Sequence, residues 1–217
     1  MRSDDEIKHD VEDELKWDPD LDATNIAVAV KDGVVTLTSF VKSYMEKYEA
    51  EIDAKRVDGI RGVANDIEVR LPAGAERPDP DIARDAVAAL KNELPYSSEH
   101  IKVLVRNGWV TLEGEVEWQF QRERAESAVR RVPGIKGVTN TIQLKPKVAP
   151  TDIKRRIEEA LRRNAEVDAQ RISVEINGSE VVLKGTVRSW AEREAAERAA
   201  WQAPGVTRVV DQVTISP

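Results

Sequence analysis

Apolar positions along the chain repeat one pattern three times. Each copy opens with apolar residues four apart, which predicts a helix with one buried stripe. Alternating apolar residues then flank a short polar turn, which predicts a β-hairpin. A stripe of small apolar residues and a last apolar run predict a second helix and a third strand. Equivalent positions are Ile7, Ile82 and Ile153 in the first helix, and Leu37, Leu112 and Leu183 in the second strand.

The second predicted helix has a narrow apolar stripe in every copy. Its small side chains would let the helix approach the sheet closely. The stripes are Ala50, Ala54 and Val57, then Ala125, Val129 and Val132, then Ala196, Ala200 and Ala203. The third strands are predicted at 63–69, 138–144 and 209–215.

Glycines mark the same two points in each copy. Asp32-Gly33 and Asn107-Gly108 supply the positive φ that a tight hairpin turn requires, and the third hairpin is predicted to be one residue longer. A second glycine follows each second helix and is expected to end it. We assign a structural turn role to Gly33, Gly59, Gly108, Gly134, Gly178 and Gly205.

These elements predict an α+β protein of three tandem α-β-β-α-β domains, at 1–71, 81–145 and 151–217. Each domain is expected to form a three-stranded mixed sheet with two helices on one face. The other face of each sheet would be bare unless a neighbour covers it. Linkers are predicted at 72–80 and 146–150, where prolines favour extended backbone.

Composition narrows the possible functions. The 217 residues include no cysteine, so disulfides and thiolate chemistry are excluded. The net charge of −7 comes from the first domain, which has 10 Lys+Arg against 18 Asp+Glu. This acidity argues against a nucleic-acid partner, because that affinity depends on neutralising phosphates. No apolar run suits a transmembrane segment or a signal peptide, so we expect a cytoplasmic protein, or a periplasmic one if a signal was removed.

Two short motifs resemble known ligand-binding sites, but the residues and elements around them do not fit such sites. Asp18, Asp20 and Asp22 have the alternation of a calcium loop, but Ala23 stands where a glycine is needed and Ala29 where a glutamate is needed. We expect a turn with Leu21 packed inward, and no metal site.

A GxxG motif with a basic residue occurs at 59–62 and 134–137. In KH domains such a loop clamps RNA between two helices. Here it joins a helix to a strand, and the third copy lacks the second glycine. We therefore read both motifs as turns, and nucleic-acid binding is not expected.

Large aromatic residues are the main candidates for a binding surface. Trp17 falls on the polar side of the first helix, and Trp201 aligns with Lys55 and Arg130, outside the core stripe. Two uses remain open: contacts with a membrane or partner, or packing over small cores and between domains. The candidate residues are Trp17, Trp109, Trp118, Trp190, Trp201 and Tyr44.

Catalysis has little support in the sequence. His9 and His100 are the only histidines and stand at non-equivalent positions. No nucleophile motif, metal-ligand spacing or phosphate loop is present. We therefore expect no enzyme activity, no catalytic residues and no cofactor.

The repeated unit resembles the BON domain, a module of bacterial osmotically inducible and nodulation proteins. The resemblance rests on the acidic loop at 18–22, the glycine hairpin, and the glycine that ends the second helix, and it covers nearly the whole chain. It implies the α-β-β-α-β fold and a non-catalytic role in osmotic or envelope stress. Many members carry two copies behind an export signal, whereas this chain has three copies.

The resemblance and the repeats give three functional hypotheses. In the first, the tandem domains engage a phospholipid surface or protein partners through several weak contacts. In the second, the protein senses a small ligand or a monovalent cation such as potassium, since one branch of the family is associated with potassium binding. In the third, it is a structural or chaperone-like stress protein.

Overall fold

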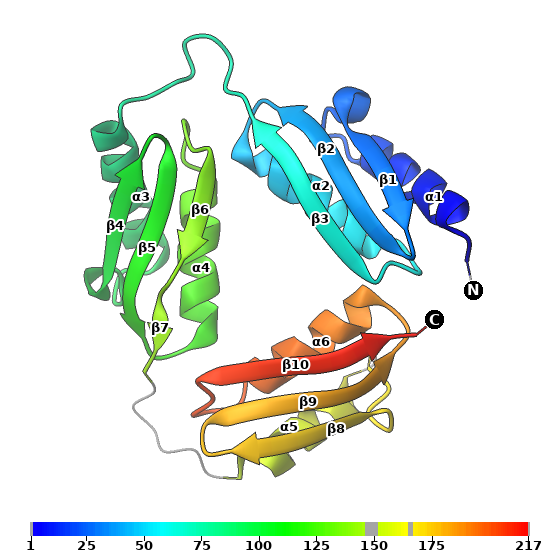
Figure 1. The fold of residues 1–217 in the computed structure, drawn as a ribbon. Coiled ribbons are helices and arrows are strands. Elements are labelled where there is room, and N and C mark those ends of the chain that lie inside the picture. Colours follow the sequence, from blue (N-terminus) through cyan, green and yellow to red (C-terminus); the bar gives the residue numbers. More distant parts are fainter. Residues whose placement is uncertain (1, 146–151, 165–166, 217) are drawn as a thin grey trace.

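The computed structural model describes residues 2–145, 152–164 and 167–216. It contains three units of the same architecture (Figure 1). The linker predicted at 146–150 lies outside the described residues.

The first unit has the predicted order of elements. Ser3 caps the first helix together with Glu6, and Ser43 caps the second. The sheet order is β1-β2-β3, with β1 antiparallel and β3 parallel to β2. The elements are α1 (Asp4–Trp17), η1 (Ala23–Asn25), β1 (Ala27–Lys31), β2 (Val34–Val41), α2 (Tyr44–Arg56) and β3 (Gly62–Val69).

The second unit differs in its third strand, which is split in two. The N–H and the hydroxyl of Thr141 both donate to the carbonyl of Leu112, each at 2.8 Å, and strand pairing is interrupted there. The predicted strand at 138–144 is therefore two short strands on β5. The elements are α3 (Asp79–Glu93), η2 (Ser98–His100), β4 (Ile101–Arg106), β5 (Trp109–Val116), α4 (Gln119–Arg130), β6 (Gly137–Asn140) and β7 (Gln143–Leu144).

The third unit repeats the mixed three-stranded sheet, in the order β10-β9-β8. Its second helix is capped by Ser189, as the equivalent Ser43 caps α2. The elements are α5 (Ile153–Arg163), β8 (Ile172–Asn177), β9 (Glu180–Val187), α6 (Trp190–Trp201) and β10 (Arg208–Ile215).

The prediction of a longer third hairpin is wrong. Arg106 pairs with Trp109 across the second hairpin, and Asn177 pairs with Glu180 across the third, so both turns contain two residues. What changes is the place of the glycine. Gly178 takes the first turn position with φ +63°, where the second hairpin has an asparagine with φ +52°. This shift makes the sequences look out of register, although the strands align without an insertion.

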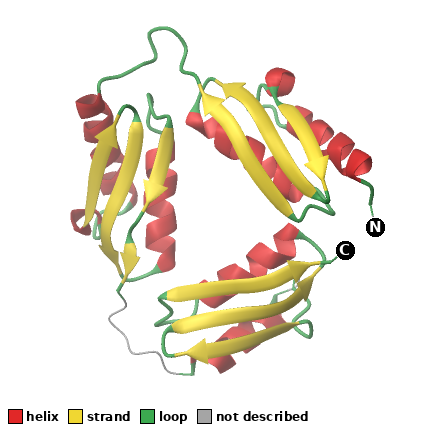
Figure 2. Ribbon diagram, viewed as in Figure 1, coloured by secondary structure: helices red, strands yellow, loops and turns green. Residues whose placement is uncertain are grey.

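Each unit has its own apolar core between the sheet and its two helices (Figure 2). The predicted helix stripes are buried in these cores, and Val57 lies at the edge of the first. The strands alternate as expected: Val35, Leu37 and Val41 of β2 point inward. Among the described residues, no helix has the length and apolar character needed to span a membrane.

The three units surround a common centre (Figure 1). The second helices α2, α4 and α6 and the third strands lie nearest to it, while α1, α3 and α5 lie farther out. All three sheets lie in front of their helices in this view. The bare sheet faces are therefore turned to the same side of the molecule.

Candidate binding site at the junction of the three units

The glycine hairpins are held by carboxylates of the same chain. Both oxygens of Asp4 accept hydrogen bonds from the turn amides of Asp32 and Gly33, at 2.8 and 3.0 Å. Asp79 binds the second turn in the same way, at 2.8 and 2.9 Å. These amides could have bound a phosphate, but an internal carboxylate already occupies them.

The GxxG motifs also serve the fold. Ile60 and Ile135, inside the two motifs, are buried in their cores. The N–H of Arg61 donates to the Gly33 carbonyl at 2.8 Å, and the N–H of Lys136 donates to the Gly108 carbonyl at 2.9 Å. Each motif therefore ties the end of a helix to a hairpin turn.

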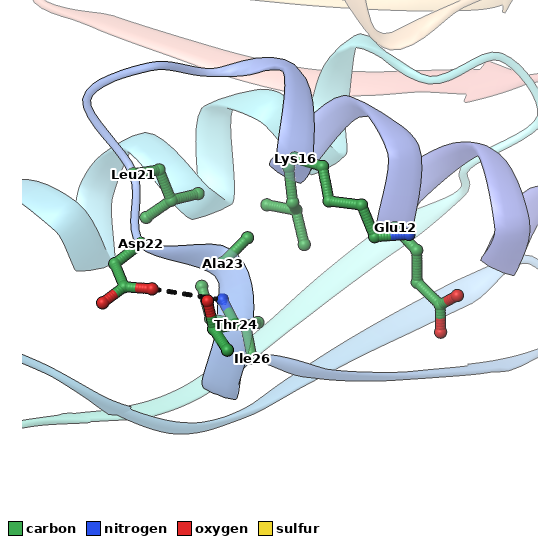
Figure 3. Close-up of a pocket in the computed structure, with 8 residues that line it drawn as sticks. Glu12, Lys16, Leu21, Asp22, Ala23, Thr24 and Ile26 are labelled. Atoms are coloured by element: carbon green, nitrogen blue, oxygen red, sulfur yellow. Dashed lines mark hydrogen bonds between the residues drawn. The ribbon is translucent and has the colours of Figure 1, made fainter.

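The acidic loop is satisfied by local partners (Figure 3). One oxygen of Asp22 accepts from the N–H of Thr24, and the other lies 3.0 Å from the Lys42 ammonium, which lowers the pKa of Asp22. A carboxylate oxygen of Asp18 accepts from the N–H of Asp20 at 2.8 Å. Leu21 is buried, as the sequence predicts. No group of three potential metal-ligating side chains occurs in the described part of the chain.

Two of the candidate aromatic residues lie away from the centre. Trp17, at the end of α1, is 85% exposed. Trp109 is 49% exposed on the bare face of the second sheet, where its ring covers Gly137 and its Nε1 donates to the hydroxyl of Thr139 at 2.8 Å. The structure brings neither of them together with the other candidates.

Tyr44, Trp190 and Trp201 lie on the second helices, where these meet a neighbouring unit. Burial raises the pKa of Tyr44, and the charge of Arg130 in the neighbouring unit opposes this rise. The indole Nε1 of Trp190 donates to Glu194 at 3.0 Å, and that of Trp201 donates to Glu197 at 3.2 Å. Trp118 is the N-cap of α4 and is half-buried beside this region.

Cation–π contacts join neighbouring units at the centre. The Arg130 guanidinium of α4 lies 3.4 Å from the ring centroid of Tyr48 in α2. The Lys55 ammonium of α2 lies 5.3 Å from the ring centroid of Trp190 in α6. Contacts of this kind contribute about 0.5–2 kcal/mol each, more when the cation is desolvated.

A hollow of about 480 Å³ lies between the three second helices. Side chains from the same three positions of each helix line it, so the repeat converges on this point. They are Tyr48, Glu123 and Glu194; Ile52, Ser127 and Arg198; and Lys55, Arg130 and Trp201. Tyr48 was not singled out as a candidate from the sequence. The available signal was the alignment of Lys55 and Arg130 with Trp201, outside the core stripe.

The fold defines a class of protein that is built of tandem α-β-β-α-β domains. Several of its tyrosine, tryptophan and arginine side chains lie where the domains meet. Residues 3–70, 78–146 and 150–217 each match the BON domain, so the chain belongs to the BON domain family.

Several known proteins are similar to this chain. Osmotically-inducible protein Y of Escherichia coli (strain K12) is 35% identical over 127 residues, which cover 57% of this chain and 63% of that protein. The match thus spans less than two thirds of that relative's length. Among solved structures, CdsD of the Chlamydia trachomatis type III secretion system is 12% identical with a TM-score of 0.28, over 98% of this chain and 93% of that one. The PrgH periplasmic domain is 11% identical with a TM-score of 0.24, over 88% and 95%.

Proposed function

We propose that this chain is a non-catalytic binding protein of the osmotic stress response, and that it engages protein partners through its three bare sheet faces. The binding units are the domains at 1–71, 81–145 and 151–217. The observation that carries the proposal is the common orientation of the sheets (Figure 2). The association with osmotic stress comes from the similarity to osmotically-inducible protein Y.

The bare faces of the first two sheets carry exposed apolar side chains. Val34 and Phe40 lie on the face of β2 opposite to its buried residues, and Phe40 is 43% exposed. Leu104 and Trp109 extend such a surface over β4 and β5. Three faces turned to one side would add weak contacts into useful avidity.

The chemistry of these faces favours a protein partner over a phospholipid surface. Phe40 lies under the Arg70 guanidinium at 4.7 Å, and Trp109 is fixed by Thr139, so both aromatic residues are held in place. Rigid aromatic and arginine side chains are typical of protein interfaces. The first domain has a net charge of −8 (10 Lys+Arg against 18 Asp+Glu), which opposes an anionic bilayer.

The test is capture of partner proteins from osmotically stressed cells, with three forms of the chain compared by quantitative mass spectrometry. We expect saturable capture that falls at least about tenfold in Phe40→Ser/Trp109→Ser, because such anchors dominate binding energy. Trp17→Ser removes a more exposed tryptophan from α1 and should leave the captured set unchanged. Equal capture by all three forms contradicts the proposal. If the chain instead co-sediments with liposomes, and the double variant does not, the partner is a membrane and not a protein.

A further inference from the structure

Two asparagines of the chain are followed by a glycine, and both lie at a hairpin turn. They are Asn107, before Gly108, and Asn177, before Gly178. In an Asn-Gly sequence the backbone nitrogen of the glycine can attack the side-chain amide carbon of the asparagine, because glycine has no Cβ to obstruct the five-membered ring that forms. Each sequence is therefore a place where the chain can modify itself, provided that the glycine nitrogen is available.

The second hairpin holds its glycine nitrogen in a hydrogen bond. The N–H of Gly108 donates to Oδ1 of Asp79 at 2.9 Å, and the N–H of Asn107 donates to Oδ2 at 2.8 Å. Gly108 is also buried. Hydrogen bonds to a carboxylate are among the stronger ones, and this one must open before the nitrogen can lose its proton and attack. Asp79 therefore protects Asn107.

The third hairpin lacks this protection. In the register of the repeat, Pro150 takes the place of Asp4 and Asp79, and proline has no side-chain acceptor. Within the described part of the chain, no group accepts a hydrogen bond from the N–H of Gly178. Asn177 and Gly178 are both exposed, and no atom of the described residues lies within 4 Å of a Cβ built on Gly178. The reacting groups are therefore accessible, and the turn leaves room for the ring.

We propose that Asn177 is a site of spontaneous deamidation, through a cyclic succinimide formed with Gly178. The nitrogen of Gly178 gives its proton to solvent and forms a bond to the side-chain carbonyl carbon of Asn177, and the side-chain nitrogen leaves as ammonia. Water then opens the ring at either carbonyl, which yields aspartate or isoaspartate. The net reaction consumes one water and releases one ammonia, and nothing is oxidised or reduced.

The product changes the bare face of the third sheet. Asn177 pairs with Glu180 across the hairpin, and Glu175 lies on the same face two residues earlier. An aspartate at this position places two like charges directly opposite each other, which weakens the pair; Arg208, at 3.1 Å from Glu180, offsets part of this repulsion. Isoaspartate also adds a backbone carbon at the end of β8. The reaction needs no partner, so it does not depend on what this face binds.

Incubation of the full chain in mildly alkaline buffer tests the site, with peptide mass spectrometry that follows asparagine, aspartate and isoaspartate at both positions. Asn177 is expected to react at least about tenfold faster than Asn107, because the hydrogen bonds to Asp79 must first open. In the chain unfolded by guanidinium chloride these bonds are lost, and the two rates should agree within about threefold. Equal rates in the folded chain, or faster reaction of Asn107, overturn the proposal. A tenfold difference that persists in the unfolded chain also overturns it, because the hairpins would not be its cause.

Two aspartates of α3 give the matched variants. Asp79→Ala frees the nitrogen of Gly108 and should raise the rate at Asn107 by about tenfold, with the rate at Asn177 unchanged. Asp81→Ala, in the same turn of the helix, keeps both hydrogen bonds and should change neither rate. Circular dichroism checks that the variants are folded, and an unchanged rate at Asn107 in folded Asp79→Ala contradicts the proposal. If Asp79→Ala does not fold, the comparison of the two positions in the wild type decides.

Discussion

A single glycine position shows how closely the hairpin strands approach each other. Gly114 and Gly185 have φ of +140° and +137°, and an added Cβ would lie 2.0 and 1.9 Å from a backbone carbonyl oxygen. The first copy has Ser39 there, at φ 151°. Its ladder ends at the pair Ala27–Thr38, whereas the second copy continues to Ile101–Gly114. The serine side chain thus costs the first domain one strand pair.

Replacement of this serine should therefore stabilise the first domain. Ser39→Gly is expected to raise its free energy of unfolding by about 1 kcal/mol, because relief of the unfavourable φ outweighs the added chain entropy. Hydrogen exchange of β1 and β2 amides measures the change within this domain. Thr38→Gly, one residue earlier on the bare face, should lower the same quantity. A loss of protection in Ser39→Gly would contradict the account.

A buried carboxylate is the other unusual residue of the first domain. The Asp53 side chain is fully buried between α2 and α1, and one of its oxygens has no hydrogen-bond partner. Burial, with the nearby charge of Asp18, raises its pKa from 3.8 to about 7, although Arg56 lies 2.7 Å from its other oxygen. The equivalent residues of the other copies, Ala128 and Ala199, carry no charge.

Stability of the first domain should depend on pH through Asp53. Because the folded pKa lies above the unfolded one, the folded state keeps a proton that the unfolded state loses between about pH 4 and 7. The contribution of Asp53 to the free energy of unfolding therefore falls as the pH rises through this window, and it is constant at higher pH. Asp53→Ala should unfold at higher urea than the wild type at pH 8, with a smaller gain at pH 5. Asp20→Ala removes an exposed carboxylate, and its effect on urea stability should be the same at both pH values. Equal gains for Asp53→Ala at both pH values would contradict the claim that the folded state keeps a proton on Asp53.

At the scale of the elements, the sequence predicts the features that depend on residues close together in the chain. Helix stripes and strand alternation follow from periods of 3.6 and 2, so the buried faces could be read directly. The split of the third strand at Thr141 could not, because it is a matter of pairing with β5, whose Leu112 lies 29 residues earlier in the chain. The hydrogen bonds from the hairpin amides to Asp4 and Asp79, which form a carboxylate clamp on each turn, were not predicted for the same reason. Asp4 and Asp79 are equivalent in the repeat, but their hairpin amides lie 28 and 29 residues away.

The clamp between α3 and its hairpin can be tested by two neighbouring aspartates. Asp79→Ala removes both hydrogen bonds to the turn and should lower the free energy of unfolding of the second domain by about 1–2 kcal/mol. Asp81→Ala, in the same first turn, loses a helix-dipole contribution and a surface ion pair with Arg84 and should cost less than about 1 kcal/mol. Hydrogen exchange of the second hairpin measures both. Equal losses would mean that the clamp contributes nothing.

At the scale of the whole molecule, the sequence predicted the three domains but not how they meet. The alignment placed Trp201 outside the core stripe and left its use open between partner contacts and domain junctions. The structure places Tyr44, Trp190 and Trp201 at the junctions. Periodicity identifies the face of a helix that packs on its own sheet, whereas the opposite face reads only as polar. The pairs Arg130–Tyr48 and Lys55–Trp190 belong to that opposite face.

The central claim is that the three domains pack as one body around α2, α4 and α6, with their bare sheets to one side. Because the chain has no cysteine, pairs of introduced cysteines give unique spin labels. Exposed positions on the three sheets are Thr38, Glu113 and Thr214. Pulsed electron–electron spin resonance on the three label pairs should give one narrow distance distribution for each, at the separations of this arrangement. Broad distributions, as expected for domains that move independently on their linkers, would contradict the account.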